Sequence, residues 1–233
     1  MTTLKPSLAL AARAAIAQRT EAMFRASGAF REGHFLLKSG RHGDAYVEKF
    51  AVLSDPAATS ELCGFWAAHV RGQADLVAGP TTGGLILAFE TARQLGVRSI
   101  FAEEVRGAEG ATHREFRRGF AIQPGERVLL VDDILTTGGS LLAMIPAIES
   151  MGGEIVECAV LVDRSGGRAS LTSPTSGRVY ALRSLWQLDL PTYEPGPATC
   201  PQCADGVAVH APGSTGTGTG PGTGTDDETT TGV

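Results

Sequence analysis

The sequence has no dense run of lysine and arginine and no stretch of the roughly 18 consecutive apolar residues that a transmembrane helix needs. Its formal net charge is −5, from 20 basic and 25 acidic side chains. These two absences give no support to a nucleic-acid-binding surface or to binding at an anionic membrane. We therefore expect a small-molecule partner, no nucleic acid and no membrane.

Cysteine is also scarce, with four residues in 233. Cys63 and Cys158 lie in apolar stretches, and Cys200 and Cys203 form an isolated C-x-x-C, so the chain has no disulfide framework. A single C-x-x-C supplies half of the ligands of a structural zinc site, and only His210 is near it in sequence. We therefore expect two ordinary thiols there and no protein-bound metal.

Strands that alternate with helices dominate the middle of the chain. We expect strands over 34–37, 45–50, 76–79, 99–102, 128–131 and 155–162, and helices over 7–27, from Asp55-Pro56 onward, over 85–95 and over 140–151. Alternation of this kind predicts an α/β fold with a doubly wound, mostly parallel sheet, preceded by a small N-terminal β hairpin, the hood. Ligands of such sheets bind beyond the carboxyl ends of the strands.

Composition divides the chain into a folding part and a tail. Residues 1–210 are expected to form one domain that includes the hood. Residues 211–233 are a Gly/Thr/Pro repeat with an acidic end, and their few apolar side chains predict a disordered tail. The Ala/Leu-rich start is interrupted by Arg13, which favours an amphipathic helix of a cytoplasmic protein over a targeting segment.

The segment 131–140, VDDILTTGGS, combines a buried strand end, two acids and a hydroxyl- and glycine-rich helix start. Glycines and small hydroxyl residues at a helix start let backbone N–H groups approach a phosphate. The carboxylates of Asp132 and Asp133 require a different partner, such as sugar hydroxyls or a hydrated Mg²⁺. A sugar that carries a phosphate satisfies both halves of the segment. If the glycines only cap a helix and the acids only end a strand, two consecutive carboxylates on a buried strand stay unexplained.

This segment resembles the phosphoribosyl pyrophosphate motif of the type I phosphoribosyltransferases. The resemblance implies that Asp132 and Asp133 are catalytic residues that hold the ribose 2′ and 3′ hydroxyls. It also implies that 136–140 cradles the 5′-phosphate. The substrate-binding residues of this segment are then Ile134, Leu135, Thr136, Thr137, Gly138, Gly139 and Ser140.

Three further segments resemble the orotate branch of that family. In 33–41, Lys38 corresponds to a lysine that contacts the substrates. In 78–84, the pyrophosphate loop, the binding residues are Thr81, Thr82 and Gly83. Arg164 corresponds to an arginine that faces the orotate carboxylate, and an Arg–carboxylate fork suits that role.

The chain departs from the family pattern in two places. Gly83 stands where many members carry a lysine, and the loop expected over 103–114 has few positive charges and several acids. The candidates in this loop to meet the leaving pyrophosphate are Arg106 and His113, followed by Arg114. Exposure on the surface is an equal alternative for each.

The resemblance as a whole implies a homodimeric, Mg²⁺-dependent enzyme that transfers phosphoribosyl from phosphoribosyl pyrophosphate to orotate in pyrimidine (UMP) biosynthesis. Two alternatives remain. One is a phosphoribosyltransferase for another base, such as a purine, which would share the phosphate motif and differ in the hood. The other is a non-catalytic regulator that senses phosphoribosyl pyrophosphate, for which the charge-poor loop is the only support.

Overall fold

A computed structural model describes residues 6–37, 39–106 and 112–212. Its internal contacts group the chain into two units. The core unit comprises Met1–Arg31 and Val47–Leu190, and the small unit comprises Glu32–Tyr46 and Pro191–Val233. The single domain expected over 1–210 stays a prediction.

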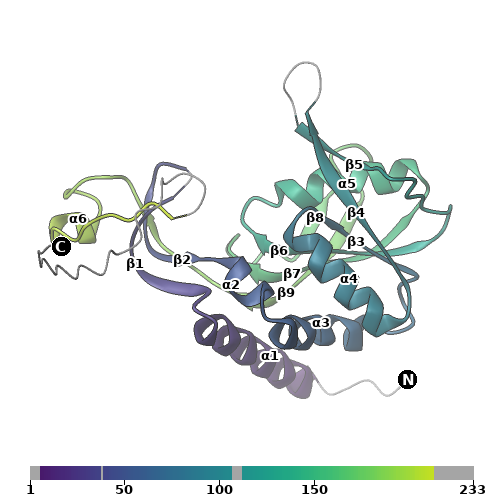
Figure 1. Ribbon diagram of the computed structural model, residues 1–233, viewed down its shortest axis with the longest axis horizontal. Helices are drawn as coiled ribbons and strands as arrows, with labels where there is room; N and C mark the ends of the chain where they lie inside the picture. The colour runs from purple at the N-terminus through teal and green to yellow at the C-terminus, as the bar shows by residue number, and fades with distance from the viewer. Residues whose placement is uncertain (1–5, 38, 107–111, 213–233) are drawn as a thin grey trace, which may run out of the picture. The chain divides into compact units, whose positions relative to one another are not determined.

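The core unit is built on a seven-stranded sheet with the order β5-β4-β3-β6-β7-β9-β8 (Figure 1). The strands are β3 (Leu76–Pro80), β4 (Arg98–Arg106), β5 (Thr112–Phe116), β6 (Arg127–Leu135), β7 (Glu154–Asp163), β8 (Ser170–Thr172) and β9 (Val179–Gln187). The five inner strands pair in parallel, while β5 and β8 pair antiparallel at the two edges. The predicted mostly parallel α/β sheet is confirmed.

The helices of the core unit cover both faces of this sheet (Figure 1). They are α1 (Pro6–Ala26), α2 (Lys49–Leu53), α3 (Pro56–Val70), α4 (Gly83–Leu95) and α5 (Gly139–Ser150). Alternation along β6 sends Leu129 and Val131 into an apolar cluster with α1–α4, and Val128 and Leu130 into a second cluster with α5. The central strand is therefore buried on both faces. None of the described helices is long and apolar enough to cross a membrane.

Local signals in the sequence account for two helix ends. Asp55 caps α3 by accepting hydrogen bonds from the backbone N–H groups of Ala57 and Ala58, and Pro56 occupies the first turn. Gly96 ends α4 in a left-handed conformation with φ of 74°.

The small unit holds a three-stranded sheet with the order β1-β2-β10. Its elements are β1 (Phe30–Leu36), β2 (His42–Val47), β10 (Thr192–Tyr193) and the short helix α6 (Pro201–Ala204), and β1 and β2 each cross the unit boundary. β10 pairs antiparallel with β2, and Phe35 forms a β-bridge with His210. The expected hairpin is thus joined by segments near the C-terminus, which the sequence did not indicate.

Two expected elements differ from the structure in kind as well as in extent. The strand expected over 45–50 ends at Val47, because Glu48 caps α2 by accepting a hydrogen bond from the backbone N–H of Phe50. The loop expected over 103–114 is mostly an antiparallel ladder of β4 and β5, and only 107–111 lies outside the described residues.

Candidate active site

The two adjacent acids lie at the carboxyl end of β6, which runs further than the expected 128–131. Asp132 and Asp133 are 8% and 5% exposed. Each carboxylate accepts a local backbone hydrogen bond, Asp132 from the N–H of Asp133 at 2.8 Å and Asp133 from the N–H of Ile134 at 2.7 Å. Asp133 also forms an ion pair with Lys49 at the start of α2, with 2.8 Å between Oδ2 and Nζ.

Burial and mutual repulsion make this pair electrostatically unfavourable. Burial, followed by the charge of Asp133, raises the pKa of Asp132 from 3.8 to about 7. The N–H of Asp133, Lys49 and Arg114 act in the opposite direction, with smaller effects. The negative charge of the two carboxyl groups is therefore only partly balanced by neighbouring groups. A ligand that brings hydroxyl donors or a cation can stabilise it further.

A hollow of about 190 Å³ opens beside these acids. It is lined by Asp132 and by the turn that leads from β6 into α5, namely Ile134, Leu135, Thr136, Thr137, Gly138, Gly139, Ser140 and Leu141. Gly138 caps α5 with φ of 83°, a conformation that favours glycine. The hollow thus combines a helix N-terminus with hydroxyl side chains, as the sequence predicted.

The loop between β3 and α4 approaches the same acids. It carries Thr81, Thr82 and Gly83, and the Thr81–Thr82 peptide is cis. A Cβ atom built on Gly83 would overlap Oδ2 of Asp133. A lysine cannot fit here without a shift of the loop or of Asp133, which gives a physical reason for the departure from the family pattern.

The β4–β5 ladder contributes one cation to that loop. The guanidinium of Arg114 donates to Oγ1 of Thr81 at 3.1 Å and to its carbonyl at 3.3 Å. His113, on the same strand, instead hydrogen-bonds Glu115 at 2.7 Å and is half exposed, while Arg106 is exposed at the end of β4. The structure therefore brings Arg114 to the expected pyrophosphate loop and leaves Arg106 and His113 on the ladder.

Arg164 follows β7, and its backbone N–H donates to the carbonyl of Leu135 at 2.8 Å. Its Nε is buried and has no hydrogen-bond partner among the described residues. Burial lowers the pKa of its guanidinium. A partly buried cation with an unpartnered N–H favours an anionic ligand.

Lys38, the remaining predicted binding residue, lies outside the described residues. The sequence prediction missed Lys49, because a lysine just after a strand has no distinctive spacing and only the fold brings it to Asp133. It also missed Arg168, which donates to the carbonyl of Thr137 at 3.0 Å and so supports the turn before α5.

Comparisons with known proteins identify the family of the chain. Residues 56–176 match the phosphoribosyl transferase domain family. The chain is 42% identical over 193 residues to orotate phosphoribosyltransferase of Caldicellulosiruptor bescii, covering 82% of this chain and 94% of that protein. It is 42% identical over 198 residues to the orotate phosphoribosyltransferase of Methylobacterium sp. (strain 4-46), covering 82% and 95%.

Solved structures give the same family. Orotate phosphoribosyltransferase from Aeropyrum pernix is 29% identical with a TM-score of 0.59, covering 72% of this chain and 93% of that one. The Mycobacterium tuberculosis H37Rv enzyme in complex with inorganic phosphate is 26% identical with a TM-score of 0.56, covering 74% and 95%. The chain belongs to the phosphoribosyltransferase family and, within it, to the orotate phosphoribosyltransferases.

Proposed function

We propose that this orotate phosphoribosyltransferase carries out its reaction at the end of β6, with the buried pair Asp132 and Asp133 as the central feature. The reaction forms a bond between N1 of orotate and C1 of the ribose, and breaks the bond from C1 to pyrophosphate with inversion. The proton of N1 is released to water or to an oxygen of the leaving pyrophosphate. The observation that carries the proposal is a buried pair of acids, whose negative charge is only partly balanced, next to a glycine-lined hollow.

The two halves of the hollow suit the two halves of phosphoribosyl pyrophosphate. The carboxylates of Asp132 and Asp133 accept hydrogen bonds from the ribose 2′ and 3′ hydroxyls. The start of α5, from Thr136 to Ser140, donates backbone and hydroxyl hydrogen bonds to the 5′-phosphate. Fixing the sugar at both ends orients C1 for attack, an effect that reaches about 7–11 kcal/mol when the geometry is ideal.

The loop with Thr81, Thr82 and Gly83 takes the leaving pyrophosphate, and Arg114 supplies positive charge beside it. The transition state has oxocarbenium character, so an anionic leaving group and a cationic ring must be stabilised together. Mg²⁺ fits this site because the carboxylate pair is only partly compensated. Asp132 and Asp133 would hold it, and it would supply positive charge against the pyrophosphate.

Arg164 takes the orotate carboxylate, and its unpartnered buried Nε supports this role. Replacing Arg164 by alanine should weaken orotate binding by roughly 1.5–3 kcal/mol, and binding of phosphoribosyl pyrophosphate far less. Calorimetric titration of each ligand tests this, with Arg178→Ala, an exposed arginine, as the control. Equal losses for both ligands would place Arg164 outside the base pocket.

The reaction itself is tested by mixing the full chain with orotate, phosphoribosyl pyrophosphate and Mg²⁺ and following the loss of orotate. Adenine and hypoxanthine serve as competing bases. Consumption of orotate alone is expected. Consumption of a purine would favour the alternative base, and binding of phosphoribosyl pyrophosphate without turnover would favour a regulator.

We also propose a homodimer in which Arg106 and His113 of one subunit reach the site of the other, as the family resemblance implies. Mixing an Asp133→Asn subunit with an Arg106→Ala/His113→Ala subunit should restore part of the activity that each variant lacks alone. No restoration would place the two residues in their own subunit's site or outside the mechanism. A cytoplasmic location is part of the same proposal, supported by four cysteines that are all free thiols.

A further inference from the structure

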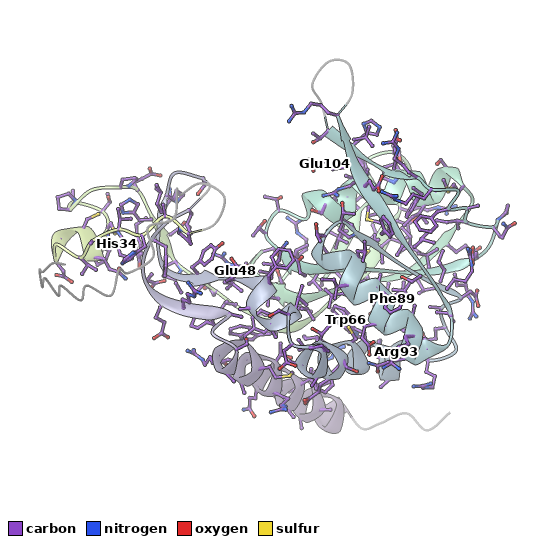
Figure 2. The ribbon with its side chains drawn as sticks, in the orientation of Figure 1. His34, Glu48, Trp66, Phe89, Arg93 and Glu104 are labelled. Atoms are coloured by element: carbon purple, nitrogen blue, oxygen red, sulfur yellow. The ribbon has the colours of Figure 1, made fainter. Side chains whose placement is uncertain are left out.

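Four side chains that can each bind a metal ion converge within the small unit. His34 lies on β1, His42 begins β2, and Cys200 and Cys203 lie at α6. Their ligand atoms all lie within 4.8 Å of one another. His34, which is labelled in Figure 2, and Cys200 are 166 residues apart, so the fold and not the local sequence makes this cluster.

The spacing of these atoms suits a tetrahedral ion. Zn–S bonds of about 2.3 Å and Zn–N bonds of about 2.0–2.1 Å place neighbouring ligand atoms roughly 3.3–3.8 Å apart. Nε2 of His34 lies 3.5 Å from Sγ of Cys200 and 3.7 Å from Sγ of Cys203. Sγ of Cys203 lies 3.3 Å from Nδ1 of His42.

The two imidazoles are closer together than an ion allows. Nε2 of His34 and Nδ1 of His42 are 2.7 Å apart, which is a hydrogen-bond distance. Binding an ion therefore requires the two ring nitrogens to separate by about 0.6 Å. Nδ1 of His42 gives up the shared proton to bind the metal, and His42 then carries its ring proton on Nε2.

A backbone hydrogen bond already orients one ligand. Nδ1 of His34 lies 2.7 Å from the carbonyl of Val207. Because a carbonyl only accepts, Nδ1 carries the proton and Nε2 presents its lone pair to the cluster. The backbone carbonyl of His34 also accepts from the N–H of His210 at 2.7 Å, so the strand itself is fixed.

The small unit buries few apolar side chains. His34, His42 and Cys200 are 2%, 8% and 1% exposed. Within the described part of this unit, no residue belongs to either apolar cluster, and Phe35 and Ala45 are its other buried apolar residues. Units of this size are usually stabilised by disulfides or a metal, and both of its cysteines are free.

We propose that the small unit binds one structural zinc ion through Sγ of Cys200 and Cys203, Nε2 of His34 and Nδ1 of His42. Two thiolates and two imidazoles in a tetrahedral arrangement are ligands that zinc prefers. Binding releases the two thiol protons, and the thiolates balance the charge of the ion. Four protein ligands leave no open position for water, so the zinc stabilises the unit and takes no part in the transfer reaction.

Metal analysis of the untagged full chain, purified without chelator, is the direct test. We expect about one zinc per chain in the wild type and less than about one tenth of that in Cys200→Ser/Cys203→Ser. Cys63→Ser and His69→Gln remove a thiol and an imidazole outside the cluster and should keep the full zinc content. Wild-type protein without zinc, or with zinc retained in the double variant, overturns the proposal.

A second measurement on the wild-type chain does not depend on how the variants fold. Cobalt exchanged for zinc should give the visible absorption of a tetrahedral ion and a thiolate charge-transfer band in the near ultraviolet. Removing zinc with a chelator should expose two additional thiols to a thiol reagent and lower the thermal midpoint. Octahedral cobalt, stoichiometric iron in place of zinc, or a Cys200–Cys203 disulfide in the purified chain contradicts a zinc site.

Discussion

The core unit and the small unit differ in the side chains that they bury. The core unit buries large apolar residues such as Trp66 and Leu129 in two clusters, one on each face of its sheet. The small unit buries two imidazoles and a thiol around a short three-stranded sheet. An extensive apolar core can offset the cost of a buried carboxylate pair, while a small sheet with few buried apolar residues can gain stability from bonds to a metal ion.

The buried polar residues of the two units also differ in the partner that they suit. In the core unit the charge of the carboxyl groups at the end of β6 is poorly balanced, and hydrogen bonds to substrate can stabilise it. In the small unit the four polar side chains converge, and one metal ion can bind to all of them. Substitutions in one unit should therefore leave the other unit unchanged, so each unit provides a control for the other.

The largest effect is expected from Leu129→Ala, which removes a fully buried side chain of β6. A cavity in a packed core lowers the free energy of unfolding by about 2–5 kcal/mol. Denaturant unfolding measures this loss, and the zinc content of the folded fraction should not change. Leu10→Ala, at a position that is 70% exposed, should cost less than about 0.5 kcal/mol. Equal losses in the two variants would contradict the account of the core.

A smaller effect, on catalysis alone, is expected from Asp133→Asn. Losing a charged acceptor for a ribose hydroxyl is worth about 1.5–3 kcal/mol, so kcat/KM should fall roughly 10- to 150-fold. Circular dichroism and zinc content should match the wild type. Asp75→Asn breaks an exposed ion pair with Arg127 and should leave kcat/KM unchanged. Normal turnover of the Asp133 variant would show that the motif is misread.

The parts of this site that could be predicted are local in sequence. A buried strand that leads through acids and glycines into a helix gives β6, the turn and α5 together, because each signal lies within a few residues of the next. The family resemblance, and not the local pattern, assigns Gly83 and 134–140 to substrate binding, and those roles stay predictions. The cap by Asp55 and the stop at Gly96 are likewise short-range.

The parts that could not be predicted depend on contacts between distant residues. Lys49 meets Asp133, and His34 meets Cys200, only after the sheets have formed. The family resemblance predicts a loop over 103–114, whereas the structure places most of this segment in the β4–β5 ladder, with Arg114 near Glu104 across it. Opposite charges on neighbouring strands suit such pairing, but only the folded chain shows which residues face each other.

The pH dependence of stability should report the buried acid of the core unit. Burial raises the pKa of Asp132 from 3.8 to about 7, so the folded protein holds a proton that the unfolded chain releases. Stability from this group therefore falls as pH rises between these two values and stays low above the upper one. Asp132→Asn has no such charge, so its thermal midpoint should exceed that of the wild type near pH 8 and approach it below about pH 4.

Thermal scans of both proteins across this pH range are the measurement, and activity is followed in parallel. The variant should be more stable at high pH and less active, because the same carboxylate is unfavourable in the fold and useful to the substrate. A midpoint difference that does not change with pH would contradict the raised pKa. Leu10→Ala, which removes no titratable group from an exposed position, should show no pH-dependent difference.

The smallest effect is expected from deleting 213–233, which lies outside the described residues. The sequence there offers Gly, Thr, Ser and Pro with an acidic end, so little apolar surface could offset an ordering cost of about 1–2 kcal/mol per residue. Zinc content, thermal midpoint and the KM for phosphoribosyl pyrophosphate should match the full chain.

Deleting 200–233 instead removes both cysteine ligands as well, and it should abolish zinc binding and lower the thermal midpoint. The pair of truncations thus locates the boundary between the part of the C-terminus that supports the small unit and the part that does not. The acidic residues 226–228 are the one feature of the shorter deletion that could affect the core unit, by competing with phosphates for the start of α5. Exposed charges contribute little at moderate salt, so we expect no change in KM on removing 213–233. A clear drop in KM would show instead that this tail competes with substrate.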